Sequence, residues 1–316
     1  MIAKIMRFSI EQRFFVVLLS IGLIIAGIYN AINLPIDAVP DITNRQVQLN
    51  TVAPALAPEE VERQITFPLE VEFAGIPGLK ETRSISQFGL SQVTLIFEDS
   101  VDIYFARSLV LERLQSAREE LPPGLAPPEM GPVSTGLGEI YYVIVQGPQD
   151  LMEKRSLLDF VVKPQLRTVP GLVEVNEFGG LKKQFQVVVD PQKLAARDLT
   201  IRDVTEALEA NNANAGGGYI RKGQEQQLVR GVGVIRNEAD IENIVLTAQN
   251  GVPVMVRDVA QVTTGGQIRQ GAVTMNGEGE AVVGITMLLL GENGRIVVDR
   301  VKDRVEQIEE SVPAGA

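Results

Sequence analysis

The feature that most constrains this chain is a run of 19 residues, 14–32, that contains no Asp, Glu, Lys or Arg. About 20 residues at a helical rise of about 1.5 Å are enough to cross a hydrocarbon layer about 30 Å thick. Lys4, Arg7 and Arg13 precede the run against the single acid Glu11, and basic residues before a span favour a cytoplasmic N-terminus. The run therefore predicts one transmembrane helix, with the residues after about 33 on the far side of the membrane.

Two other interpretations of the run remain open. A cleaved signal peptide usually has an apolar core of about 7–15 residues and a small-residue cleavage site, and the sequence YNAINL at 29–34 is a poor match to such a site. A buried helix of a soluble protein seldom lacks every charge over such a length.

Charge sets the remainder of the chain apart from this run. The whole chain has 29 basic and 40 acidic residues, of which 3 and 1 lie in residues 1–33, so the body has 26 and 39 and a net charge of −13. This balance is typical of a soluble domain and argues against a nucleic-acid partner, because phosphate binding needs a basic face. The chain has neither cysteine nor histidine, which excludes disulfides, zinc-finger sites and Ser-His-Asp or Cys-His catalysis. We expect no enzyme activity and no cofactor, and an anchored hydrolase has little support.

Beyond residue 34 the apolar patterns alternate between strand and helix periods. Strands are predicted at 46–52, 80–87 and 91–97, and helices at 58–74 and 102–120. We expect the second helix to bury Phe105, Leu109, Leu111 and Leu114. The order matches the start of the β-α-β-β-α-β pattern of a split-βαβ, or ferredoxin-like, unit, and the chain is therefore predicted to be α+β.

The pattern then begins again, with a strand at 141–146, a helix at 157–167 and a last helix at 296–310. The turn VPGL at 169–172 repeats IPGL at 76–79, and VPAG at 312–315 resembles LPPG at 121–124. In the first copy of the pattern, 45 residues separate Pro77 of the turn from Pro122 at the end of the last helix. In the second copy, 143 residues separate Pro170 from Pro313, which predicts an insertion of about 98 residues near 182–271. The alternative is that Pro-Gly turns recur by chance.

Within the predicted insertion we expect a strand at 184–189, a helix at 201–209 and a loop at 212–223. The glycines 216–218 lie in that loop, and they favour a flexible hairpin tip over a phosphate-binding loop because no Lys-Ser pair follows them.

Several segments resemble the resistance–nodulation–division (RND) efflux pumps: LPIDAVPD at 34–41, SQFGLS at 86–91 and VDPQKL at 189–194. Others are similar to the heavy-metal efflux branch of that family, and most to its cobalt–zinc–cadmium pump subunit: GPVSTGLGEIY at 131–141, NN at 211–212, GGYI at 217–220 and GEN at 291–293. The resemblance covers the whole chain.

The resemblance implies the N-terminal part of a bacterial inner-membrane, proton-driven exporter of divalent zinc, cobalt or cadmium. It implies a homotrimer with a periplasmic adaptor and an outer-membrane channel as partners. It divides the chain into the cytoplasmic N-terminus and first transmembrane helix (1–33), a first porter subdomain (34–133), a second porter subdomain (134–181 and 272–316) and a docking subdomain (182–271). Members of the family are longer, so the chain is expected to be a fragment, without the proton-relay acids and most of the metal cleft.

The resemblance also singles out Glu139 as a candidate metal ligand that faces the porter cleft, with Asp159 as a weaker second candidate. The alternative is that both are ordinary polar positions. A carboxylate suits Zn²⁺ or Co²⁺, whereas a thioether suits Cu⁺. Met255, Met275 and Met287 are expected to fill the core, and the alternative is a path for a soft metal. The alternative to a pump is a single-span, membrane-anchored periplasmic binding or scaffold module.

Overall fold

The computed structural model describes residues 10–32, 43–223, 225–249, 251–269 and 271–312. The predicted motif at 34–41 and the end at 313–315 lie outside the described residues. The chain divides into two compact units; one comprises Met1–Val143, Val162–Asn176 and Gly284–Ser311, and the other Ile144–Val161, Glu177–Val283 and Val312–Ala316. The subdomain boundaries expected from the internal repeat stay a prediction.

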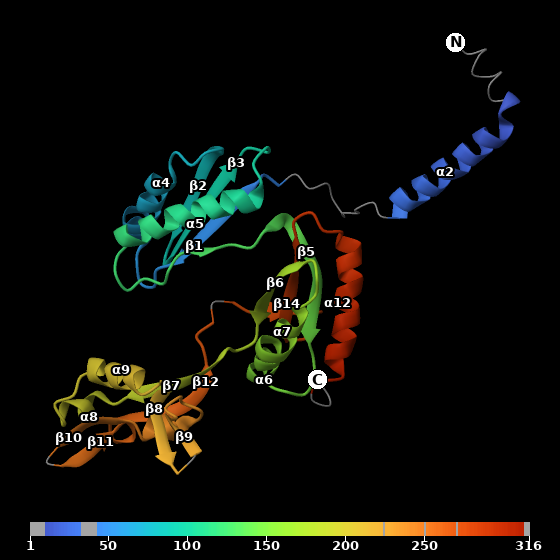
Figure 1. The fold of residues 1–316 in the computed structure, drawn as a ribbon. Coiled ribbons are helices and arrows are strands. Elements are labelled where there is room, and N and C mark those ends of the chain that lie inside the picture. The colour runs from blue at the N-terminus through green and yellow to red at the C-terminus, as the bar shows by residue number, and fades with distance from the viewer. Residues whose placement is uncertain (1–9, 33–42, 224, 250, 270, 313–316) are drawn as a thin grey trace. The chain divides into compact units, whose positions relative to one another are not determined.

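The apolar run forms the helix α2 (Arg13–Ile32), as predicted (Figure 1). In the part of the chain that the structure describes, α2 is the one helix long and apolar enough to cross a membrane. None of its side chains is buried within the chain, so its apolar surface is open on every side.

The first repeat is built on an antiparallel sheet in the order β2-β3-β1-β4. Its strands are β1 (Gln46–Val52), β2 (Leu79–Gln87), β3 (Leu90–Phe97) and β4 (Glu129–Met130). Alternate residues of β1, namely Val47, Leu49 and Thr51, are buried, so one face of the sheet carries the core. The predicted β2–β3 hairpin is confirmed, and Gly89 takes the left-handed φ of +72° that its turn requires.

The first predicted helix is one helical run with an irregular middle: α3 (Pro58–Val61), the π-helical turn η1 (Glu62–Thr66) and α4 (Phe67–Phe73). The corresponding helix of the second repeat has the same form, α6 (Leu151–Leu157), η2 (Leu158–Val162) and α7 (Lys163–Leu166). Each π turn ends two residues before a proline, Pro68 or Pro164. A proline ring clashes with the carbonyl four residues earlier, and the wider π turn relieves that clash.

The helix α5 (Ile103–Glu120) covers the core face of the first sheet (Figure 1). Asp102 caps it, and its carboxylate accepts hydrogen bonds from the backbone N–H groups of Tyr104 and Phe105, both at 3.0 Å. The predicted buried face is wrong in part, because Phe105 is 55% exposed and Leu111 45% exposed. The buried stripe follows the helical period more closely, through Ile103, Ala106, Val110, Leu114 and Ala117.

In the second repeat β14 (Glu280–Leu289) pairs with β5 (Ser134–Val145), β6 (Leu172–Gly179) and β13 (Val273–Thr274). With the two-residue strand β13 left aside, the third strand in chain order, β14, lies between the first, β5, and the second, β6, as β3 lies between β1 and β2 in the first repeat. The predicted strand and helix both begin too late, because β5 starts at Ser134 and α6 at Leu151, directly after its capping residue Asp150. The last helix is α12 (Gly294–Glu309).

The segment between β6 and β14 has a core of its own. Its strands are β7 (Lys183–Val189), β8 (Ala215–Lys222), β9 (Glu225–Gly231), β10 (Val245–Gln249), β11 (Val252–Met255) and β12 (Ala260–Gly266). Its helices are α8 (Pro191–Ala195), α9 (Ile201–Ala210), α10 (Glu238–Glu242) and α11 (Val256–Val259). The buried side chains are Leu194, Val204, Ile241, Ile244, Val254, Val256, Val259, Ala260 and Val262.

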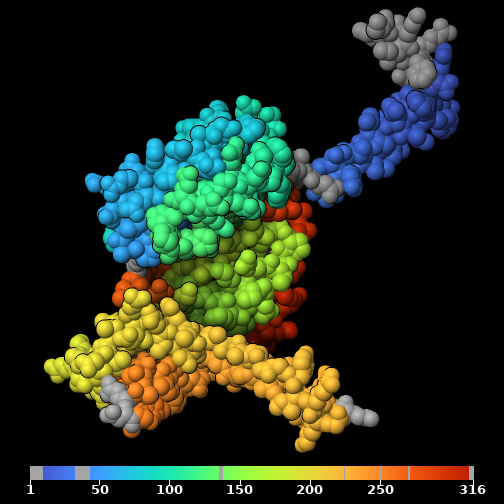
Figure 2. All heavy atoms as spheres, turned by 60° about the vertical axis from the view of Figure 1, so that its left-hand side comes forward, coloured from blue at the N-terminus to red at the C-terminus, as the bar shows by residue number. Residues whose placement is uncertain are grey.

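The glycines 216–218 lie in the strand β8, so their assignment to a loop and a hairpin tip is wrong. They pair with β9 across a register shift between Gly216 and Tyr219, where Gly218 has a φ of +77° and a Cβ on Gly217 would lie 2.7 Å from a methyl of Val229. A side chain at this point would break the hairpin. The hairpin β8–β9, yellow-orange in Figure 2, projects from the rest of its unit, and all residues of its two strands are exposed.

Candidate metal-ion site

Glu139, the first predicted ligand, lies on β5 and is exposed. Its carboxylate accepts a 2.7 Å hydrogen bond from the hydroxyl of Tyr142. This bond and the negative charge of Glu139 raise the pKa of Tyr142, because both favour the protonated phenol. The Glu139 carboxylate is exposed, so a cation from solution can reach it.

Asp159, the second predicted ligand, lies on the π turn η2 and is mostly buried. Its carboxylate forms a 2.9 Å ion pair with Arg155, one helical turn earlier. A cation at Asp159 would have to displace this guanidinium. Asp159 and Glu139 belong to different compact units, so each is described alone.

Among the residues that the structure describes, no group of three or more His, Cys, Asp or Glu side chains is placed to hold a metal ion. Divalent cations in proteins usually take several ligands, so a site at Glu139 would need more than this carboxylate. Met255, Met275 and Met287 are all half-buried, and the Met275 sulfur accepts a 3.9 Å contact from the Gln146 amide.

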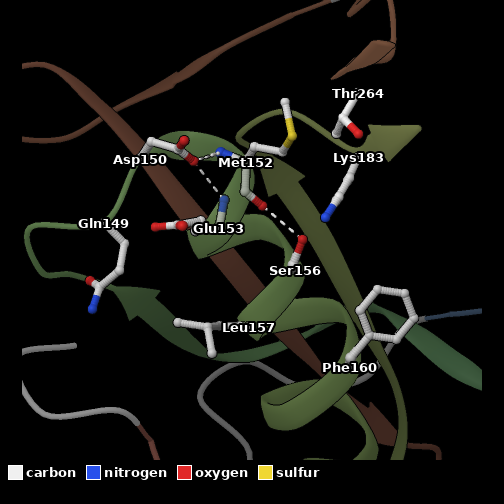
Figure 3. A pocket seen from close by; sticks show the side chains of 9 residues that line it. All are labelled: Gln149, Asp150, Met152, Glu153, Ser156, Leu157, Phe160, Lys183 and Thr264. Atoms are coloured by element: carbon white, nitrogen blue, oxygen red, sulfur yellow. Dashed lines mark hydrogen bonds between the residues drawn. The ribbon is translucent and has the colours of Figure 1, made fainter. Parts of the chain in front are cut away.

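A hollow of about 640 Å³ opens beside the start of α6 in the second unit (Figure 3). The carboxylate of Asp150 accepts hydrogen bonds from the backbone N–H groups of Met152 at 2.8 Å and Glu153 at 2.7 Å. The hydroxyl of Ser156 donates to the Met152 carbonyl at 2.8 Å. Asp150 is therefore engaged in capping the helix. Lys183 and Thr264 also line the hollow.

Sequence reasoning missed this hollow. Its lining comes from α6, β7 and β12, which are far apart in the chain, and only the capping Asp150 has a local signal in the sequence.

Comparisons with known proteins show which family the sequence matches. The AcrB/AcrD/AcrF family matches residues 5–316. The chain is 49% identical to Protein HelA of Legionella pneumophila, 47% to the cobalt-zinc-cadmium resistance protein CzcA of Cupriavidus metallidurans and 43% to the cation efflux system protein CusA of Escherichia coli K12. Each comparison covers 100% of this chain and 30% of the relative, so the chain spans about 30% of the length of these curated relatives.

Two crystal structures of a heavy metal efflux pump are similar to the fold. Crystal form II has a TM-score of 0.87 and 38% identity over 96% of this chain and 30% of the pump chain. Crystal form I has a TM-score of 0.86 and 36% identity over 98% of this chain and 31% of that one.

Proposed function

Because the chain belongs to the AcrB/AcrD/AcrF family of RND transporters, we propose that it is the N-terminal part of an inner-membrane pump that exports heavy-metal cations. The observation that carries the proposal is the match along the whole chain, in sequence and in fold, to heavy-metal efflux proteins. In this proposal α2 crosses the membrane with its N-terminus in the cytoplasm, and the residues after about 33 lie in the periplasm. The open apolar surface of α2 supports this assignment.

The proposed layout assigns both repeats to porter subdomains of the ferredoxin-like, split-βαβ type, at 34–133 and at 134–181 with 272–316. The strand order β2-β3-β1-β4 and the matching neighbours β5, β14 and β6 support this assignment. The insert, 182–271, is the proposed docking subdomain for the outer-membrane channel, and its separate core supports its treatment as a subdomain.

We propose that the pump is a homotrimer that works with a periplasmic adaptor. The hairpin β8–β9 supports contact with another chain, because a lone two-stranded hairpin is marginally stable in water. Tyr219, Ile220 and Leu228 on this hairpin are 70%, 57% and 66% exposed. Burial of these side chains against a second copy would remove them from water.

The proposed substrates are divalent zinc, cobalt or cadmium, carried in exchange for protons. The hard carboxylate of Glu139 supports this class, and so does the name of the cobalt-zinc-cadmium relative. Residues 14–32 carry no Asp, Glu, Lys or Arg, so the proton relay is assigned to other membrane segments of the whole protein.

Calorimetry on the intact protein with Zn²⁺, Co²⁺ and Cu⁺ tests the metal class. We expect Glu139→Ala to weaken zinc binding, and Glu119→Ala, on the exposed face of α5, to leave it unchanged. An unchanged zinc affinity in Glu139→Ala would remove Glu139 from the site. Residues 1–316 alone, reconstituted in liposomes, are expected to give no metal-dependent proton flux, and transport by this chain alone would contradict the proposal that it is one part of a pump.

A further inference from the structure

The guanidinium of Arg155, on α6, bonds through all three of its nitrogens to groups on η2 and at the end of β6. Its Nε pairs with Asp159 at 2.9 Å on its own helical run. Its Nη2 lies 3.3 Å from a carboxylate oxygen of Glu177, and its Nη1 donates to the Gly179 carbonyl at 3.0 Å. The Arg155 side chain is 13% exposed, so these bonds form away from bulk water. A planar fork that engages three acceptors fixes the end of β6 against α6.

Gly179 and Gly180 bring the backbone closer to its neighbours than any side chain would allow. Both have left-handed φ values, +74° and +69°. A Cβ on Gly179 would lie 2.1 Å from the Ala281 carbonyl oxygen of β14. A Cβ on Gly180 would lie 2.9 Å from the Leu151 carbonyl and 3.0 Å from the Arg155 Cβ. The chain therefore leaves β6 pressed against β14 and the start of α6.

The segment that leads from β6 into the insert is hydrogen-bonded to the segment that leads from the insert back to the second repeat. The N–H of Leu181 donates to the Leu151 carbonyl at 3.3 Å, and the N–H of Gln267 donates to the Lys182 carbonyl at 2.8 Å. From the next residue onward β7 and β12 pair along their whole length, from Lys183 opposite Gly266 to Val189 opposite Ala260. The connection that leaves β6 is therefore bonded to the start of α6, and the returning chain is bonded to it as far as Gln267.

The returning segment makes a second, weaker contact, a partly exposed ion pair between Arg269 and Glu280, the first residue of β14. Each of the two connecting segments thus makes a bond to a helix or strand of the second repeat. Two hydrogen-bonded connecting segments restrict bending and twisting of an insert far more than flexible linkers of the same length would.

We propose that Arg155 and the glycine pair Gly179–Gly180 form a rigid joint that couples residues 183–266 of the insert to α6 and to the end of β6 in the second repeat. A movement of α6 and β6 then carries the insert with it as one body. The joint does not depend on which cation the protein moves, or on whether it moves one.

Distance measurements between spin labels on the intact protein test this joint. The chain has no cysteine, so single cysteines can be placed at exposed Gln146, just after β5, and at exposed Glu209, at the end of α9. Pulsed electron paramagnetic resonance then reports the width of the distance distribution between them. Dilution of labelled protein with an excess of unlabelled protein removes distances between copies.

We expect one narrow distribution in the parent protein and at least a twofold broadening in Arg155→Gln and in Gly180→Ala. The matched control is Arg202→Gln, which removes an exposed ion pair with Glu206 on α9 and should leave the width unchanged. A broad distribution in the parent protein, or an unchanged width in both variants, would overturn the joint.

A second label pair within the insert, Glu209 with Val252 on β11, reports whether the insert stays folded. We expect its width to remain the same in every variant. If Arg155→Gln also broadens this inner pair, Arg155→Lys decides the matter, because lysine keeps the positive charge but not the three-way fork. Broadening of only the Gln146–Glu209 distance in Arg155→Lys supports the joint, and no broadening there contradicts it.

Discussion

Three hydrogen-bonded hydroxyl groups, two of them buried, link the π turn η1 to two strands of the first sheet. The hydroxyl oxygen of Thr66 lies 2.8 Å from those of both Ser86 and Ser91. Thr66 is 1% exposed and Ser91 fully buried, whereas Ser86 is half-buried and can turn toward water. Thr66→Val keeps the side-chain shape but removes both hydrogen bonds and leaves the Ser91 hydroxyl without its partner on the helix.

The expected loss of stability is about 1–3 kcal/mol, because a buried hydroxyl left without its partner costs the full penalty of its removal from water. That loss corresponds to amide exchange about 5- to 150-fold faster in β1 and β3. Adding Ser91→Ala removes the stranded hydroxyl, so the double variant should regain most of the lost protection, although each change removes a hydrogen-bonding group.

Hydrogen exchange of the β1 and β3 amides in the intact protein is the assay, with Thr94→Val as its control. Thr94 lies on β3 but on the half-exposed face of the sheet, so the same substitution there should change exchange little. Unchanged protection in Thr66→Val, or a double variant no better protected than the single one, would refute the reasoning.

Three further outcomes follow from the described contacts. Phe73→Ala, at a fully buried site of the first core, should destabilise that subdomain by about 3–5 kcal/mol, as measured by amide exchange in the first sheet. Asp102→Ala removes the cap of α5 and should cost about 1 kcal/mol, seen as faster exchange in the first turn of that helix. Since Glu139 raises the pKa of Tyr142, their bond persists below the ordinary phenol pKa and is lost as pH rises through the raised value. Glu139→Gln should therefore move one step of the ultraviolet tyrosinate titration to lower pH, and an identical curve would count against the bond.

The order of elements could be predicted because each has a local signal. The alternation of β1, the proline in the first turn of α3 and the turn at Gly89 all depend on neighbouring residues. The π turns before Pro68 and Pro164 were not predicted, because a proline disturbs the helix before it without fixing which residues form the wider turn. The glycines of β8 were misread because their partner strand β9 and the bulge between them are set by pairing rather than by local preference.

The contacts of the candidate ligands also differ in whether neighbouring residues in the sequence could predict them. The pair between Arg155 and Asp159 has the four-residue spacing of a helical ion pair, but the helix was predicted to begin only at 157, so this signal was missed. Glu177 and Gly179 join that pair only because β6 folds back beside α6, which no local pattern reports. Glu139 was singled out by resemblance, and its bond to Tyr142 depends on side-chain geometry that the spacing does not fix.

The central claim, that the whole protein exports heavy-metal cations, is tested most directly by transport. The intact protein, reconstituted into liposomes that enclose a zinc-sensitive dye, is placed under a proton gradient. We predict zinc movement against the direction of proton flow, lost on addition of a protonophore. Zinc movement that is absent, or the same with and without the proton gradient, would contradict the account.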